Sequence, residues 1–426
     1  MRADCEVLAK PLTNSRSRIL FVNDCGFVGG AGIGVRRQVQ SCLLAGFEVR
    51  VLCWMEGGGD DLRVGRAGSF SGTWLGIDRR PDLHVTRGLR PLTIVERACD
   101  AVLLSDPDLV VFGNLHWASW PLQLISAVRD TGIPTIAYLH DIHWVSGRCA
   151  YPGTCAQYVS GCDAECPTPT EYPPLPANQI ASAWTARREV FTGSGRVPIA
   201  TNSTWTTEIA DRGFSGEADV RTIWLGLDTS LFEPFPKWIA RKLLGVPEDA
   251  VIAICGAVDL GEERKGGEML RQCVAALARE RQVMVLGFGH NSQFFEGIHG
   301  VGSVLDERQM PILFNAADFV INAAKEEAFG QTLMEAAACG LPIVGTDVGG
   351  VRDIARPETN ALLVPYGDTE GMLDCVRRLA IDVGLRRQMS HASRVIVKSD
   401  FSLERQAEAW TAMVDELFDR QNCNAS

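Results

Sequence analysis

Short runs of β-branched and other apolar residues alternate with longer amphipathic stretches along most of this chain. Each apolar run has the length of a buried strand, and each amphipathic stretch has the length of a helix. Alternation of this kind is typical of βαβ units and parallel sheets, so we expect an α/β protein. The expected strands cover 18–23, 48–53, 109–112, 135–139 and 198–201, and a second series covers 250–256, 283–287, 319–322 and 342–346.

The two series of strands predict two domains. With 426 residues, the chain exceeds the size at which a single hydrophobic core stops growing. We expect two doubly wound, Rossmann-like domains that face each other across a cleft near 210–230. The expected boundaries are 1–212 for the first domain, with an insertion at 146–178, and 213–400 for the second. A C-terminal segment, 401–426, holds a helix predicted to cross back to the first domain.

Composition narrows the function classes. The net charge is -11, from 52 acidic and 41 basic residues, which disfavours a general nucleic-acid binder. The first residues lack the apolar core of a signal peptide, and no apolar run is long enough to span a bilayer. We therefore expect a cytoplasmic protein, with peripheral contact at the inner face of the membrane left open.

The segment KEEAFGQTLMEAAACGLPIVGTDVGG, residues 325–350, shows the clearest candidate chemistry. Glu327 lies in the loop after an expected strand, at the C-terminal end of that strand, where α/β proteins bind ligands. A helix then begins at Gly330, Gln331 and Thr332, and its free N–H groups favour a diphosphate. Glu335 lies further into that helix, within reach of ribose hydroxyls. The segment indicates a nucleotide-sugar site. In the alternative interpretation Glu327 is solvated and Glu335 only stabilises its own helix.

Two features of the first domain also lie where strands end. Gly29 and Gly30 belong to a glycine-rich turn before a helix, which can approach a phosphate or sugar, or can serve packing alone. Its spacing does not fit a dinucleotide-binding fingerprint. His140 follows the expected strand at 135–139 and can donate a hydrogen bond to a sugar hydroxyl or to developing charge. The alternative is a histidine satisfied by local backbone.

Four cysteines lie close together in a segment rich in glycine and proline, directly after His140. Four thiols in such a loop indicate an insertion that is cross-linked through its cysteines, rather than core residues. The cross-link can be zinc, an iron–sulfur cluster or two disulfides. A reducing cytosol favours a metal over disulfides. The four are Cys149, Cys155, Cys162 and Cys166.

The 325–350 segment closely resembles the Glu-x7-Glu region of the retaining glycosyltransferases of family four. The Phe-Gly turn, the helix of small residues, the Gly340-Leu341-Pro342 stop and the Gly349-Gly350 loop all follow in the family's order. The resemblance implies the two-domain GT-B fold. It also implies a retaining transfer of a sugar from a nucleoside diphosphate to a hydroxyl of a glycan, lipid-linked glycan or small acceptor. Polysaccharide or glycoconjugate assembly is the implied setting, and no cofactor is needed for catalysis.

The resemblance also assigns residue roles. It implies that Glu327 orients the sugar, Glu335 holds the ribose and His140 lies beside the donor sugar. Phe329 belongs to the turn that shapes the donor site, and Gly287 to the loop beside the nucleotide base.

A basic pair in the second domain is implied to contact the leaving diphosphate. Lys265 matches the family's lysine. Family members often have an arginine directly after Gly256, but this chain has Ala257, so Arg264 is left to supply guanidinium contacts. A cysteine-bearing stretch like the one here occurs in some polysaccharide-building relatives, which implies a lid or acceptor-side role.

Two other functions fit the same residues. One is a sugar-nucleotide epimerase or phosphorylase on the same fold, which a product assay distinguishes. The other is a non-catalytic scaffold that binds a glycan or nucleotide, which Ala257 mildly favours and the retained Glu327, Glu335 and Lys265 disfavour.

Overall fold

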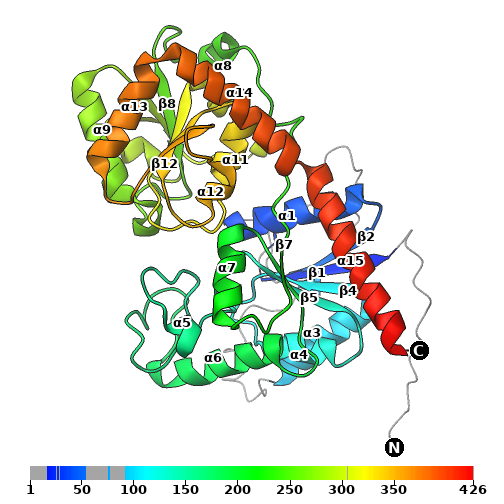
Figure 1. Ribbon diagram of the computed structural model, residues 1–426. Helices are drawn as coiled ribbons and strands as arrows, with labels where there is room; N and C mark the ends of the chain where they lie inside the picture. The colour runs from blue at the N-terminus through cyan, green and yellow to red at the C-terminus, as the bar shows by residue number, and fades with distance from the viewer. Residues whose placement is uncertain are drawn as a thin grey trace, which may run out of the picture.

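The protein consists of two α/β domains, each built on one parallel sheet (Figure 1). The structure, a computed structural model, describes residues 17–24, 26–27, 29–53, 75–76, 92–304 and 306–425. The first sheet has the order β3-β2-β1-β4-β5-β6-β7 and the second has the order β10-β9-β8-β11-β12-β13. The strands are β1 (Arg18–Asn23), β2 (Glu48–Cys53), β3 (Leu75–Gly76), β4 (Leu109–Phe112), β5 (Thr135–Leu139), β6 (Ile199–Thr201), β7 (Val220–Thr222), β8 (Ile252–Gly256), β9 (Met284–Phe288), β10 (Ile298–Gly300), β11 (Phe319–Asn322), β12 (Ile343–Thr346) and β13 (Ala361–Val364).

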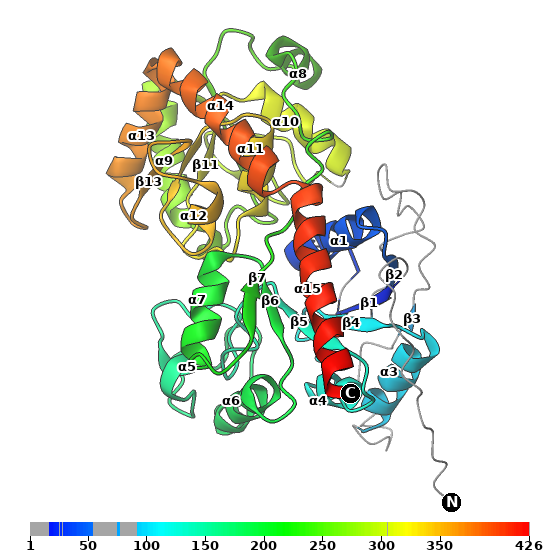
Figure 2. The same ribbon diagram turned by 45° about the vertical axis from the view of Figure 1, so that its right-hand side comes forward.

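Helices cover both faces of each sheet, which confirms the predicted α/β class (Figures 1 and 2). Every residue of the central strands β4 and β5 is therefore buried. The helices are α1 (Gly29–Leu44), α3 (Leu92–Leu104), α4 (Gln123–Arg129), α5 (Gln157–Ser160), α6 (Ala177–Thr192), α7 (Thr204–Gly213), α8 (Lys237–Leu244), α9 (Gly267–Glu280), α10 (Met310–Ala316), α11 (Gln331–Ala338), α12 (Val351–Ile354), α13 (Thr369–Ile381), α14 (Val383–Asp400) and α15 (Leu403–Ala425).

The strands that the sequence pattern did not predict are the edges of the two sheets. All nine predicted strands are present, within two residues of the expected bounds. The four that were missed, β3, β7, β10 and β13, are the outermost strands. The edge strands β7 and β10 are short and partly exposed, so they lack the long apolar run that identifies a central strand. This reason does not apply to β13, which is apolar and mostly buried.

The last helix, α15, returns to the first domain. Figures 1 and 2 show it leaving the second domain after α14 and running along the first domain beside α1. Trp410 of α15 is fully buried there. Its ring stacks on Tyr138 of β5 and meets the edge of Phe21 of β1, with ring centroids 5.9 Å apart in both pairs. The helix therefore completes the core of the domain opposite to the one it leaves.

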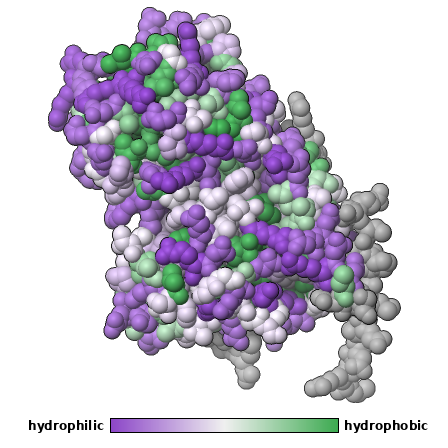
Figure 3. Space-filling model, in the orientation of Figure 1, coloured by the Kyte–Doolittle hydropathy of each residue, from purple (hydrophilic) through white to green (hydrophobic). Residues whose placement is uncertain are grey.

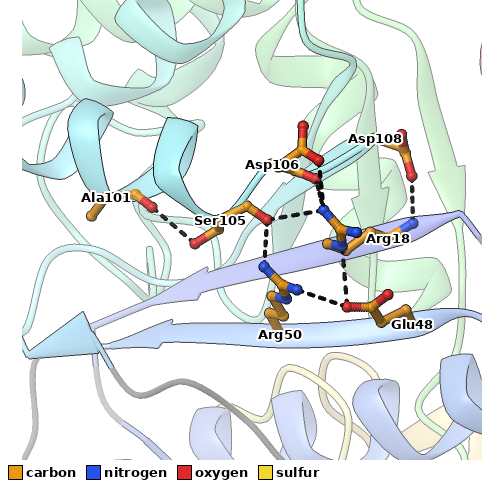
Figure 4. Close-up of polar contacts among 7 residues, drawn as sticks. All are labelled: Arg18, Glu48, Arg50, Ala101, Ser105, Asp106 and Asp108. Atoms are coloured by element: carbon orange, nitrogen blue, oxygen red, sulfur yellow. Dashed lines mark hydrogen bonds and ion pairs between the residues drawn. The ribbon is translucent and has the colours of Figure 1, made fainter. Parts of the chain in front are cut away.

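A polar network closes the end of the first sheet at which β1 begins (Figure 4). The backbone N–H of Arg18 donates to Asp108 at 2.7 Å, and its guanidinium pairs with Glu48 at 3.1 Å and Asp106 at 2.9 Å. Arg50 donates to Glu48 at 2.9 Å. Because this network lies at the opposite end of β1 from the glycine-rich turn, its role is to hold the strands in place.

The visible face in Figure 3 is a mosaic in which hydrophobic residues form small separate groups on both domains. In the described part of the chain, no helix combines the length and the apolar character that a membrane crossing needs.

Candidate active site between the two domains

The loop after β11 places Glu327 beside Lys265. The Glu327 side chain is largely buried, and its Oε2 accepts a hydrogen bond from Lys265 Nζ at 2.5 Å. Burial alone disfavours the charged carboxylate. The Lys265 ammonium, with further help from Arg264 and the Phe329 N–H, outweighs burial and lowers the pKa of Glu327. Two residues that the sequence assigned to sugar and diphosphate therefore form an ion pair with each other.

A glycine fixes the position of Lys265. Gly266 adopts φ 72° and precedes α9. A Cβ on Gly266 would lie 1.7 Å from the carbonyl oxygen of Ala323, just past the end of β11. Only glycine permits this approach, so the loop is held against the strand that leads to Glu327.

Arg264 contacts the cysteine-bearing segment, 147–167, from the second domain. The part of the second domain that faces this segment comprises the loops 257–266 and 323–330 and is called the donor loop below. Its Nε donates to Glu262 at 2.9 Å, and its guanidinium carbon lies 4.4 Å from the ring centroid of Tyr151. The Gly153 N–H donates to the Glu326 carboxylate at 2.7 Å. The segment that contains Tyr151 and Gly153 therefore lies against the second domain, next to the loop that carries Glu327.

The start of α11 faces the first domain. Gly330, with φ 98°, precedes the helix, and the Gln331 Nε2 donates to the carbonyl of Gly30 at 2.6 Å. Thr332 follows in the first turn. The Phe329 ring is buried, 5.7 Å from that of Phe401, so it packs in the core and only its backbone faces Glu327. The glycine-rich turn and the helix N-terminus are therefore adjacent, with Cys25 and Val28 of that turn outside the described residues.

Glu335 has a partner that the sequence did not reveal. Its carboxylate accepts a hydrogen bond from Arg37 Nη2 at 2.5 Å, and Arg37 Nη1 donates to Gln331 Oε1 at 2.7 Å. Arg37 comes from α1 of the first domain and is 1% exposed. Arg37 lies on the same helical face as Gly34 and Ser41, and only the structure shows that this face is buried.

His140 ends β5 in a buried position. Gly34 makes room for it, because a Cβ there would lie 2.9 Å from the imidazole ring. Burial first, and His116 second, lower the pKa of His140 to about 3, so the ring is neutral at physiological pH. Its Nε2 is buried without a hydrogen-bond partner in the described structure. The backbone-satisfied alternative therefore does not account for this nitrogen.

A second polar cluster lies beside His140 and was also not predicted. Asp141 accepts hydrogen bonds from Asn114 Nδ2 at 3.0 Å and from the His143 N–H at 2.9 Å. His116 Nε2 lies 3.6 Å from the same carboxylate. The loops after β4 and β5 converge here because the two strands are neighbours in the sheet.

Gly287 lies where the prediction of its surroundings was wrong. We expected it to belong to the loop beside the nucleotide base, but it is the fourth residue of β9 and pairs with Gly300 of β10. A Cβ on Gly287 would lie 2.5 Å from Ile298 Cγ2. The glycine is therefore required for packing between β9 and the edge strand β10, and the loop after β9 begins at Gly289.

The four clustered cysteines are all free thiols. The Gly147 N–H donates to Cys162 Sγ at 3.2 Å, a contact that favours a thiolate. Burial first, and the other three thiols after it, raise the pKa of Cys162 to about 11. Four thiols suit zinc or an iron–sulfur cluster chemically, but nowhere in the described residues are three His, Cys, Asp or Glu side chains arranged to hold a metal ion. The metal site stays a prediction.

A comparison with protein families bears on the second domain. Residues 249–382 match the family described as glycosyl transferases group 1. These residues form a glycosyl transferases group 1 domain. The matched region contains Lys265, Glu327 and Glu335, whereas Gly29, Gly30 and His140 lie outside it.

One curated relative and two solved structures extend the comparison. The D-inositol 3-phosphate glycosyltransferase of Saccharomonospora viridis is 31% identical over 224 residues, which are 47% of this chain and 49% of that protein. The chain thus spans about half the length of the curated relatives it matches.

The solved structures match almost the whole chain. Sucrose-phosphate synthase of Thermosynechococcus elongatus has a TM-score of 0.70 at 20% identity, covering 95% of this chain and all of that one. Anabaena HepE in complex with UDP-glucose has a TM-score of 0.69 at 17% identity, covering 94% of this chain and 99% of that one. At such identities the likeness concerns the fold, which is GT-B as predicted.

Proposed function

We propose that this chain is a retaining glycosyltransferase that moves a sugar from a nucleoside diphosphate to a hydroxyl of a glycan, lipid-linked glycan or small acceptor, in polysaccharide or glycoconjugate assembly. The observation that supports it best is the arrangement of Glu327 and Glu335 on either side of the α11 N-terminus, inside the group 1 domain. The UDP-glucose bound by HepE supports a nucleotide-sugar donor by analogy of fold.

In this mechanism the diphosphate lies at the start of α11. The free N–H groups of Gln331 and Thr332, with Lys265 and Arg264, stabilise the negative charge that grows as the glycosidic bond breaks. Glu327 orients the sugar and Glu335 the ribose. The neutral His140 has an unpartnered Nε2, which can form a hydrogen bond with a sugar hydroxyl. The acceptor proton passes to the departing phosphate on the same face, so no separate base is required.

The first domain would hold the acceptor. The cysteine-bearing segment supports this division because it contacts the donor loop through Tyr151 and Gly153. We propose that it acts as a cover on the acceptor side, with the protein in the cytoplasm and in peripheral contact with the membrane when the acceptor is lipid-linked.

A screen of nucleotide sugars tests the function. Purified protein is incubated with UDP-, GDP- and ADP-sugars, and donor hydrolysis and thermal stabilisation are measured. We expect one donor to be hydrolysed slowly and to stabilise the fold. With an acceptor, NMR should show that the anomeric configuration is retained. An isomerised donor or free sugar phosphate would favour an epimerase or phosphorylase, and binding with no turnover would favour a scaffold.

Glu335→Gln tests the donor assignment. One charge-assisted hydrogen bond is worth roughly 1.5 to 3 kcal/mol, so nucleotide affinity should fall about ten- to a hundredfold. Isothermal titration with the nucleotide identified by the screen measures the change. Glu370→Gln is the control, because Glu370 also lies near the start of a helix in this domain but is exposed. Equal affinity of Glu335→Gln and the parent would remove Glu335 from the site.

A further inference from the structure

Arg37 is a buried cation that one domain inserts into the other. It lies on α1 of the first domain, yet its guanidinium contacts only acidic and amide groups of the second domain among its side-chain partners. Nη2 lies 2.5 Å from Glu335 Oε1 and 3.6 Å from Glu307 Oε1, and Nη1 lies 2.7 Å from Gln331 Oε1. With 1% of its side chain exposed, water cannot replace these partners.

These contacts occupy the groups that a nucleotide needs. Gln331 is the first residue of α11 and Glu335 lies one turn later, so Arg37 spans the helix face next to the proposed diphosphate position. Arg37 Nη2 occupies Glu335 Oε1, so a ribose hydroxyl that binds this oxygen takes the place of the guanidinium. Removing the anion from a buried arginine is strongly unfavourable unless another anion takes its place.

The diphosphate is the anion available at this position. The two cations of the second domain that are proposed to contact the diphosphate are shared with carboxylates, because Lys265 also contacts Glu327 and Arg264 also contacts Glu262. A diphosphate carries more charge than the helix N-terminus alone balances. Arg37 lies next to that N-terminus and loses its own partner when the ribose arrives.

We propose that Arg37 is a diphosphate-binding residue supplied by the first domain, paired with Glu335 until the ribose takes that carboxylate. This proposal rests on the proposed function and extends it to a residue outside the group 1 domain. Nucleotide binding then exchanges one ion pair for another, and the exchange is favourable only when the ligand brings phosphate. The site should therefore discriminate strongly between a nucleoside diphosphate and the same nucleoside without phosphate.

The test compares two ligands on three variants. UDP and uridine, or the corresponding pair with the base that the screen identifies, are titrated calorimetrically into the parent, Arg37→Met and Arg37→Lys. We expect Arg37→Met to lower the preference for the diphosphate over the nucleoside about ten- to a hundredfold, since a charge-assisted contact is lost. Arg37→Lys should keep part of the preference, because lysine keeps the positive charge but cannot make the bidentate hydrogen bonds of a guanidinium.

Arg36→Met is the matched control. Arg36 is adjacent on α1 and pairs with Glu307, and in the described structure no hydrogen bond or ion pair joins it to Gln331 or Glu335. It should leave the preference unchanged, while thermal unfolding of each variant shows that the fold persists. If Arg37→Met fails to fold, the preference for the diphosphate over the nucleoside is compared between Arg37→Lys and the parent, and a lower preference in Arg37→Lys supports the proposal.

Each outcome has one meaning. A fall in UDP affinity greater than the fall in uridine affinity supports the proposal. Equal changes for both ligands, whether weaker or tighter, would show that Arg37 only supports the fold or only competes with the ribose, and would overturn it. A parent protein that binds no nucleotide at all contradicts the proposed function itself, which separates that failure from failure of the Arg37 assignment.

Discussion

Charged side chains in the candidate site are paired with each other, so a ligand must exchange partners rather than fill empty positions. Lys265 pairs with Glu327, and Arg37 with Glu335. Buried pairs of this kind add little net stability, but breaking one without a replacement is costly. In the proposed mechanism, these ion pairs hold the residues in place before the donor arrives, and binding depends on the charge that the donor brings.

His140 gives a pH prediction at the same scale. Its pKa is about 3 in the folded protein, below the ordinary 6.5, so the unfolded chain binds more protons between these values. Stability should be fully present above pH 6.5 and fall as the pH drops toward 3, by on the order of a few kcal/mol from this group. Replacing His140 with Gln removes this contribution, so the loss of stability between pH 7.5 and 4.5 should shrink.

Urea unfolding at the two pH values measures the effect. His299→Gln, which changes an exposed histidine, should keep the loss seen in the parent. His143, also buried with a lowered pKa, remains in every variant and contributes equally. Identical acid sensitivity of His140→Gln and the parent would contradict the assignment of a neutral buried ring.

At the scale of elements, the segment from 147 to 167 joins the two domains at the site. It follows β5, lies against the donor loop through Tyr151 and Gly153, and contains short turns in place of a long helix. We expected its four cysteines not to be core residues, but Cys162 is buried in the core of the first domain, and Cys149 and Cys166 pack against that core.

The metal hypothesis predicts stoichiometric zinc or an iron–sulfur cluster in protein purified without chelator. Elemental analysis and a visible spectrum distinguish the two. Replacing Cys155 and Cys162 together by Ser should release the ion and increase hydrogen exchange in 147–167, because metal binding contributes to local folding. Cys375→Ser, a half-buried thiol on α13, is the control. Metal-free protein with four free or disulfide-bonded thiols would refute the hypothesis.

At the scale of the whole molecule, α15 makes the stability of one domain depend on a segment that follows the other. Arg221 of β7 pairs with Glu416 of α15, and Ser41 of α1 donates to Gln406 at 2.7 Å. Trp410 fills the first domain's core between Phe21 and Tyr138. The first domain therefore includes α15, a segment that follows the second domain in the chain.

Trp410→Ala should destabilise the first domain by about 3 to 5 kcal/mol through the cavity that it leaves. Hydrogen exchange followed by mass spectrometry should show faster exchange in β1 and β5, with β8 and β11 of the second sheet little changed. Trp238→Ala, at a tryptophan of α8 that is 55% exposed, is the matched control and should change neither domain. Uniform destabilisation of both sheets would show that the domains unfold as one unit.

The sequence alone determined the central strands, the α/β class and the donor segment. Period and composition act locally, so a fully buried strand such as β4 or a helix that begins at Gly330 is visible in consecutive residues. Tertiary structure decided the rest. The edge strands depend on neighbours far along the chain, and the partners of Glu335 and Glu327 come from residues 298 and 62 positions away. No local pattern records such a pairing, because Lys265 meets Glu327 only after the second domain has folded, and Arg37 meets Glu335 only after the two domains have packed together.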